Sequence, residues 1–242
     1  MREAVIVSAA RTPIGKAYRG AFNNLESPSM ASVAVKAAVD RSGIDPKEVD
    51  DCIMGAAIQQ GTQGFNLGRQ VAMASGLPVS VAGMTIDRQC SSGLMTIATG
   101  AKHIINDNAP ITIAGGCESI SLVQNEHMNS HRIGDPLTIK NAPMIHMPML
   151  DTAETVAKRY NISREAQDEY AVASQDRTAD AQVRGAFDDE IVPVTAIKMI
   201  MNKETGEVTK EEVTLTKDEG NRPGTTIENL ANLKPVRNDG TI

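Results

Sequence analysis

The stretch from Val81 to Asn108 constrains the fold of this chain more than any other part of the sequence. An apolar run from Val81 to Ile86 stops at a polar triplet, Cys90 follows, and a segment rich in Ala, Ile and Leu then continues without proline to about Asn108. This pattern predicts a buried strand that turns into a buried helix, with Cys90 at the turn. Unpaired N–H groups and the helix dipole favour an anion there, so a thiol at that place loses its proton more readily. The pattern favours a nucleophilic cysteine, with a buried structural cysteine as the alternative.

The same alternation of strand and helix extends through the first 121 residues. The apolar run Ala4–Ala9 predicts a central strand buried on both faces, and Ser27 is expected to cap a helix that ends near Gly43. Further strands are predicted within Val49–Ala57 and Pro110–Gly116, with a helix through Arg69, Val71 and Ala72 between them. The order predicts an α/β fold, a mostly parallel sheet with helices on both faces. Ligands bind beyond the carboxyl ends of such strands, where Cys90 lies, and this strengthens the nucleophile interpretation.

The character of the chain changes after Ser121. Residues 122–150 are irregular and rich in Met, His and Pro, and two helices are expected next, one from near Asp151 and one after Ser163. A hairpin is predicted around Asn202–Gly206. We expect residues 1–121 to form an N-terminal α/β domain and 122–235 a mainly helical loop insertion. Residues 236–242 would begin the return to the first domain.

Composition excludes several classes of protein. The 24 basic and 30 acidic residues give a net charge of −6, which argues against a general nucleic-acid or membrane-surface binder. Three cysteines without CxxC spacing suggest neither a disulfide framework nor a metal site, and they fit reduced thiols in the cytoplasm. No signal peptide or bilayer-length apolar stretch is visible. We therefore expect a soluble cytoplasmic protein.

Several blocks of sequence, in order along essentially the whole chain, resemble the thiolases. Because the blocks are independent of one another, the resemblance is far more specific than one short motif. They are Val5–Gly15, Arg88–Leu94, Ala114–Ser119, Thr152–Glu154, Ser163–Asp168 and Leu233–Pro235.

The resemblance implies an acyl-CoA C-acyltransferase, which forms or cleaves a 3-oxoacyl-CoA. Cys90 would carry the acyl group as a thioester, and its N–H would be one donor of an oxyanion hole. Acetyl-CoA and 3-oxoacyl-CoA would be the substrates, with no tightly bound cofactor and no metal. The loop Gly64–Phe65–Asn66 resembles one that reaches the partner subunit in thiolases, which implies a homodimer or a dimer of dimers.

CoA binding is implied for residues of the loop insertion. Arg222 aligns with the arginine that reaches the adenine nucleotide, and Met149 falls in the stretch that lines the pantetheine. Asn229 matches a neighbouring position, and His146 lies two residues from the position of the family's usual histidine. Cys117 is expected to be a packing residue.

Two thiolase blocks do not occur in these 242 residues: the one whose His activates the nucleophile and the one whose second Cys moves the substrate's α-proton. Of the four histidines, His103 would lie about 20 Å along the helix from Cys90. We therefore interpret the chain as the N-terminal half of a thiolase with its loop domain, inactive alone. A non-catalytic CoA-binding or assembly subunit is the alternative. A condensing enzyme of fatty-acid synthesis has the same general fold, but the Ala114–Ser119 and Thr152–Glu154 blocks argue against it.

Overall fold

The computed structural model describes residues 2–242, which form two compact units. The first unit holds the chain up to Asn129 together with Asp188–Gly220, and the second holds Ser130–Phe187 together with Asn221–Ile242. These units do not coincide with the predicted insertion at 122–235, because residues 188–220 group with the first unit. Each unit is described below by itself.

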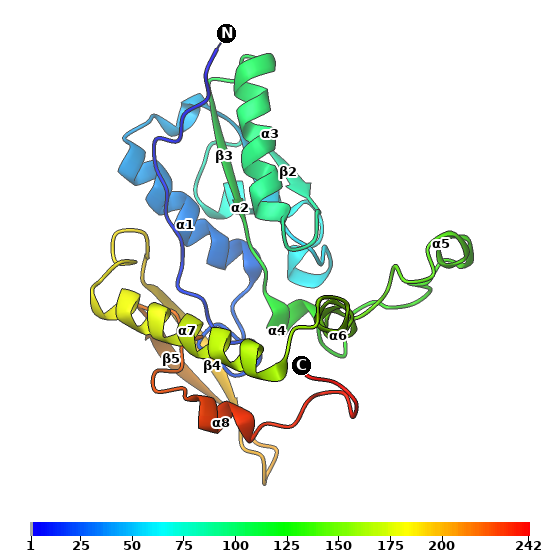
Figure 1. Ribbon diagram of the computed structural model, residues 1–242. Coiled ribbons are helices and arrows are strands. Elements are labelled where there is room, and N and C mark those ends of the chain that lie inside the picture. Colours follow the sequence, from blue (N-terminus) through cyan, green and yellow to red (C-terminus); the bar gives the residue numbers. More distant parts are fainter. Residues whose placement is uncertain (1) are drawn as a thin grey trace. The chain divides into compact units, whose positions relative to one another are not determined.

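A three-stranded parallel sheet forms the centre of the first unit (Figure 1). Its strands are β1 (Val49–Gly55), β2 (Ala82–Ile86) and β3 (Ile111–Gly116), in the order β2-β1-β3. Gly55 is in register with Ile86 and with Gly116, so the carboxyl ends of all three strands are level. The predicted α/β fold with a mostly parallel sheet is confirmed.

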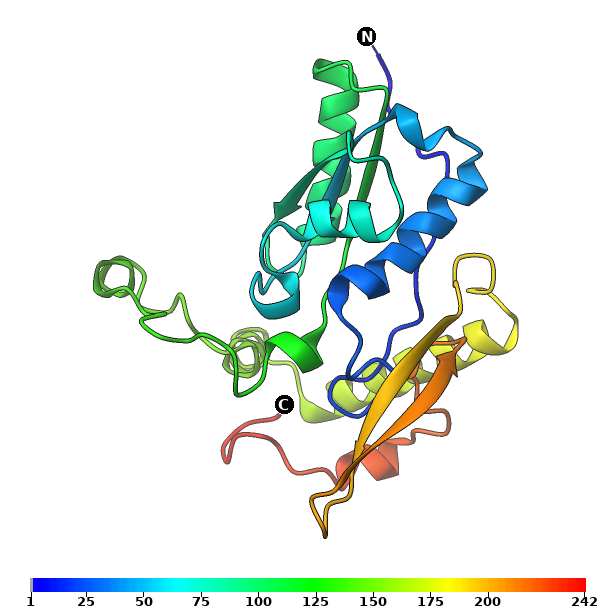
Figure 2. The same cartoon turned by 180° about the vertical axis from the view of Figure 1, so that it is seen from behind.

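Helices cover both faces of this sheet (Figures 1 and 2). Helices α1 (Ser27–Ser42) and α2 (Leu67–Ala74) lie on one face and α3 (Ser92–Asn106) on the other, and α4 (Ile120–Val123) follows β3. Short 3₁₀ turns occupy Pro46–Glu48 and Gly61–Gln63. The core between the first face and the helices includes Val35, Cys52, Met54, Leu67, Val71 and Val81.

Two expectations for the beginning of the chain were wrong. Ser27 is the first residue of α1 and not its cap, because its buried hydroxyl donates to Gln63 Oε1 at 3.1 Å instead. The run Ala4–Ala9 forms no strand, and Val5, Ile6 and Val7 are 71%, 78% and 67% exposed. A strand needs neighbours for its main-chain N–H and C=O groups, and no strand of this unit pairs with the run.

The predicted hairpin is confirmed. Strands β4 (Val194–Met201) and β5 (Val208–Leu215) pair antiparallel around a turn in which Gly206 has a φ of +73°. Val194 and Ala196 of β4 pack against Ala21 and Phe22. This apolar contact explains why the hairpin groups with the first unit.

The second unit is helical. Its elements are α5 (Pro136–Asn141), α6 (Met149–Tyr160), α7 (Arg164–Val183) and α8 (Ile227–Ala231), which confirms the two helices expected after Asp151 and Ser163. Ser163 caps α7 by accepting the N–H of Ala166 at 3.2 Å. In the part of the chain that the structure describes, we find no helix with the length and apolar character needed to cross a membrane.

Candidate functional site

Cys90 lies exposed in a tight turn between β2 and α3. Gln89 has a φ of +50°, and its N–H donates to Asp87 Oδ1 at 2.7 Å. The hydroxyl of Ser92 accepts the N–H of Arg88 at 2.9 Å and donates to the C=O of Gln89 at 2.6 Å. The turn is thus closed by bonds among neighbouring residues, and it presents the thiol just ahead of the first turn of α3.

Glycines allow α3 to approach the ends of the strands. A Cβ on Gly55, the last residue of β1, would lie 2.5 Å from the carbonyl carbon of Ser92, a distance that real Cβ atoms do not reach. A Cβ on Gly116 at the end of β3 would lie 3.3 Å from the Cα of Gly93. These contacts fix the amino end of α3, and with it the Cys90 turn, at the carboxyl edge of the sheet.

A buried polar network supports the neighbouring loops at the same edge. The carboxylate of Glu118 accepts the N–H of Ala57 at 2.8 Å and the amide of Gln63 at 2.5 Å. Gln63 is fully buried, and its Oε1 accepts from Ser27 and from the N–H of Ser119. The sequence gave no signal for Gln63 beyond its place in a polar loop. Its amide, which donates and accepts at once, joins three segments that are distant in sequence.

The other two cysteines differ from Cys90 in burial. Cys52 is fully buried in β1, and Cys117 follows β3 with its thiol 3.6 Å from the C=O of Ser27. Burial raises the pKa of both thiols to about 12, so both remain protonated at neutral pH. Cys90 is therefore the exposed thiol of the chain, and the packing role expected for Cys117 agrees with its surroundings.

His103 lies in the last turn of α3, at the opposite end of the helix from Cys90. Its Nδ1 is 3.9 Å from Asp51 Oδ2, and burial raises the pKa of that carboxyl. His127 and His146 are exposed. Among residues 2–242 no three His, Cys, Asp or Glu side chains gather in a way that could hold a metal ion.

The loop Gly64–Phe65–Asn66 leads into α2 with two residues at positive φ. Phe65 has a φ of +48° and is 98% exposed, while Asn66 has a φ of +60° and caps α2 by accepting the N–H of Arg69 at 3.2 Å. The guanidinium of Arg69 donates to the C=O groups of Val79 and Val81. Arg69 thus serves the structure of the unit, and Phe65 presents an uncovered aromatic ring.

All four CoA-binding candidates belong to the second unit. Met149 begins α6 and is 73% exposed, and His146 lies exposed in the turn before it. Arg222 is exposed in the loop before α8, where its main-chain N–H donates to Gln175 Oε1 at 2.8 Å. Asn229 lies exposed on α8. Their side chains are accessible to a ligand, and their role in CoA binding stays a prediction.

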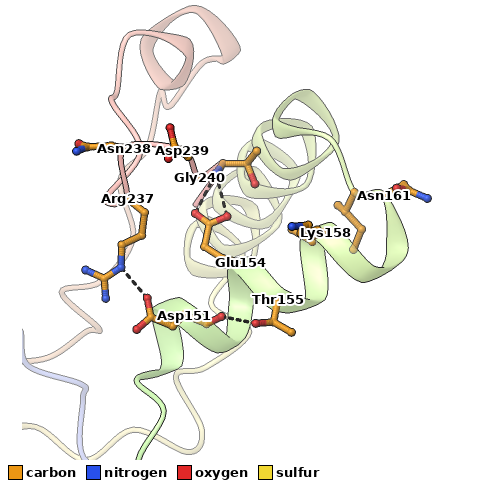
Figure 3. Close-up of a pocket in the computed structure, with 12 residues that line it drawn as sticks. Asp151, Glu154, Thr155, Lys158, Asn161, Arg237, Asn238, Asp239 and Gly240 are labelled. Atoms are coloured by element: carbon orange, nitrogen blue, oxygen red, sulfur yellow. Dashed lines mark hydrogen bonds and ion pairs between the residues drawn. The ribbon is translucent and has the colours of Figure 1, made fainter. Parts of the chain in front are cut away.

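A separate feature of the second unit joins α6 to the last residues of the chain (Figure 3). Glu154 accepts the N–H of Thr241 at 2.9 Å and the N–H of Ile242 at 2.8 Å, while Arg237 Nε lies 2.6 Å from Asp151 Oδ1. The N–H groups of Ile242 and Thr241 lower the pKa of Glu154, and the Arg237 guanidinium lowers that of Asp151. These contacts border an open cavity of about 690 Å³ that shares no lining residue with the Cys90 turn. Sequence reasoning noticed Glu154 only as part of a block and missed this contact.

Comparisons with known proteins agree over the whole chain. Residues 4–242 match the family model described as thiolase, N-terminal domain. The chain is 40% identical to the 3-ketoacyl-CoA thiolase of Bacillus subtilis over all of its own length and 61% of that protein. It is 38% identical to the acetyl-CoA acetyltransferase of Cupriavidus necator, covering 98% of the chain and 60% of that protein. A crystal structure of the Bacillus anthracis acetyl-CoA acetyltransferase matches with a TM-score of 0.83 at 37% identity, over 100% of this chain and 61% of that one. The chain thus spans about three-fifths of the length of these relatives.

Proposed function

This chain belongs to the thiolase family, and from that premise we propose that it supplies the acyl-carrying part of an acyl-CoA C-acyltransferase. The reaction would form or cleave a 3-oxoacyl-CoA. The observation that carries the proposal is Cys90, an exposed thiol at the carboxyl edge of a parallel sheet, directly before a helix. The names of the relatives, 3-ketoacyl-CoA thiolase and acetyl-CoA acetyltransferase, support the same reaction class.

In the cleavage direction, the Cys90 sulfur adds to the ketone carbon of the 3-oxoacyl-CoA. The bond between that carbon and the α-carbon then breaks, and its electron pair leaves with acetyl-CoA, whose α-carbon takes up a proton. The acyl group remains on Cys90 as a thioester until the thiol of CoA accepts it and Cys90 is regenerated. Because an enzyme thioester and a CoA thioester are similar in energy, neither transfer is strongly uphill.

The N–H of Cys90 would stabilise the oxygen that becomes negative during each addition. Losing one donor of this kind typically costs on the order of 10²–10³ in rate. The turn suits this role because its own bonds, from Ser92 to Arg88 and Gln89, hold the main chain around Cys90 in place before substrate arrives.

We expect no turnover from the 242-residue polypeptide alone. The blocks that carry the activating His and the second Cys of thiolases do not occur in it, and His103 is placed at the far end of α3 beside Asp51. Acetoacetyl-CoA cleavage by the pure polypeptide, abolished in Cys90→Ala, would refute this.

The decisive experiment uses a chimera that continues residues 1–242 with the part of the B. subtilis relative that lies beyond the match. We expect it to cleave acetoacetyl-CoA and to lose this activity to background in Cys90→Ala. Cys117→Ala is the matched control and should retain activity, because that thiol is protonated and engaged with Ser27. A chimera that stays active without Cys90 would overturn the mechanism.

CoA binding in this proposal falls to Arg222, Met149, Asn229 and His146. The Arg222 guanidinium is suited both to stacking on a base and to pairing with phosphate. Arg222→Ala should weaken CoA binding measured by calorimetry and reduce its dependence on salt, whereas Arg184→Ala, an exposed arginine of the same unit, should not. An unchanged affinity in Arg222→Ala would remove that residue from the site.

The second candidate function is a CoA-binding or assembly subunit without catalysis. The observation in its favour is that the chain spans only three-fifths of its relatives while containing all four CoA candidates. A chimera that folds and binds CoA but neither acylates Cys90 nor cleaves acetoacetyl-CoA would support this candidate. Homodimerisation and a cytoplasmic location stay predictions, since the relatives include peroxisomal thiolases of mouse.

A further inference from the structure

The N-terminal run of the first unit is apolar, suited to a β-strand and yet unpaired. Val5, Ile6 and Val7 are β-branched, which favours strands, and each is at least two-thirds exposed. Among residues 2–242 the main chain of Ala4–Ser8 makes no recorded hydrogen bond. An exposed apolar segment with free N–H and C=O groups is a template for pairing with another strand.

The run is nevertheless held at its carboxyl end. The C=O of Ala9 accepts from Arg41 at 3.1 Å, and Arg11 exchanges main-chain bonds with Glu190 and Val192 at 2.9 and 2.8 Å. The guanidinium of Arg11 also donates to both carboxylate oxygens of Asp218. The position of the run is therefore set by the first unit itself.

Between the run and β3 lies a groove of about 920 Å³, here named the edge groove, which is bordered by Ala4–Ala9 on one side and Ile111–Gly116 on the other. Both views show the run and β3 side by side, heading in the same direction (Figures 1 and 2). Because β3 is the last strand in the order β2-β1-β3, its outer edge has no strand partner. The groove thus has main-chain donors and acceptors along both sides.

The size of the edge groove matches one strand. A strand as long as β3, six residues, is about 20 Å long, about 4.8 Å wide within a sheet and about 10 Å thick between layers, which gives roughly 950 Å³. The groove is covered by Ala34, Val35 and Ala38 of α1 and by Ile97, Ala101 and Ile104 of α3. Since these helices lie on opposite faces of the sheet, the fitting strand is apolar on both faces.

We propose that the edge groove is the seat of one added β-strand, supplied by the part of a thiolase that the relatives carry beyond the matched segment. That part makes up about two-fifths of the B. subtilis relative, of which the chain covers 61%. A strand satisfies the N–H and C=O groups along both sides of the groove, whereas an acyl chain or another apolar small molecule leaves them unpaired. The proposal rests on membership of the family and not on the chemistry of Cys90.

Hydrogen exchange tests this proposal directly. In the 242-residue chain, the amides of Ala4–Ser8 should exchange at nearly the rate of an unfolded peptide, and in the chimera described above they should exchange about 100-fold more slowly. The outer amides of β3 should gain protection in parallel. Should the chimera not fold, the same measurement on the chain mixed with the separately produced downstream part decides.

A pair of matched variants sharpens the test. Ile6→Asp places a charge on the run at a site that is now 78% exposed, so the first unit should still fold while the added strand is rejected and protection is lost. Val79→Asp places the same charge at an 81% exposed site outside the groove and should leave protection intact.

Two results would overturn the proposal. One is a folded chimera in which Ala4–Ser8 exchange as fast as in the chain alone. The other is protection in the chain alone that rises with its concentration, which would make a second copy the occupant. A Cys90→Ala chimera that keeps the protection but loses activity separates the proposal from the proposed function.

Discussion

The two units hold their functional candidates in different ways. In the first unit, Ile53, Leu67 and Val71 are fully buried between the sheet and its helices, and the Cys90 turn is built on the ends of those elements. In the second unit the buried side chains are Ala157, Asp168 and Ala181, and the long-range contacts are mostly charged or polar. The nucleophile is thus positioned by packing, and the CoA candidates by surface hydrogen bonds and ion pairs. Changes of side-chain volume should therefore affect the first unit, and changes of charge or pH the second.

The largest effect is expected from a cavity in the first unit. Ile53→Ala removes a fully buried side chain from β1 and should lower the free energy of unfolding by about 4 kcal/mol. The measurement is urea unfolding, followed by hydrogen exchange of the β1 amides. Val79→Ala, at an 81% exposed site, is the control and should change stability by less than about 0.5 kcal/mol. Equal effects of the two variants would contradict a unit held by its core.

A pair of glycine variants tests whether packing sets the Cys90 turn. Gly55→Ala forces β1 and α3 apart, because the new Cβ would lie 2.5 Å from Ser92, and it should cost about 2–3 kcal/mol. The rate at which Cys90 reacts with iodoacetamide in the folded protein should change with it. Gly93→Ala is the matched control, since its Cβ would meet nothing closer than 3.9 Å. If both variants leave the reactivity of Cys90 unchanged, the glycine contacts do not position the turn.

The sequence predicted those features whose causes are local. The strand, turn and helix around Cys90 follow from an apolar run, a polar triplet and a small-residue helix, and the cap at Ser163 follows from one side chain. The strand at Ala4–Ala9 failed because a strand depends on neighbours, which a run of residues cannot supply by itself. Ser27 failed as a cap for a related reason, since Gln63, 36 residues away, takes its hydroxyl.

The candidate site divides along the same line. Cys90 could be found from its neighbours in sequence, and the resemblance to thiolases named the CoA candidates. Gln63 and Glu154 could not be found, because each acts on main-chain groups far away in the chain, 56 residues for Gln63 to Ser119 and 87 for Glu154 to Thr241. Polar side chains in a loop or a first helical turn carry no sign of such partners.

An intermediate effect is expected at the one strongly charged contact that anchors the run in the first unit. Burial opposes the charge on Asp218, but hydrogen bonds from Arg11 and from the N–H of Ile14 outweigh it and lower the pKa of Asp218. Asp218→Ala should cost about 2 kcal/mol by urea unfolding. Since the folded pKa is lowered, this contribution is complete above the ordinary value of 3.8 and is lost as pH falls through the lowered one. A difference between wild type and Asp218→Ala that vanishes between pH 7 and 5 would contradict this.

The smallest effect, and the one most specific to the second unit, is expected at Glu154. Its pKa is lowered by the N–H groups of Ile242 and Thr241, so the carboxylate should accept their bonds throughout the neutral range and release them only as pH falls below 4.5. Two-dimensional NMR should show the Thr241 and Ile242 amide signals moving together in that acid range. Glu154→Gln removes the charge that strengthens both bonds, so these amides should shift and exchange faster already at pH 7. Glu165→Gln, an exposed glutamate on α7, should leave them in place. Signals that titrate above pH 4.5, or that respond equally to both variants, would mean that the end of the chain is held by something other than Glu154.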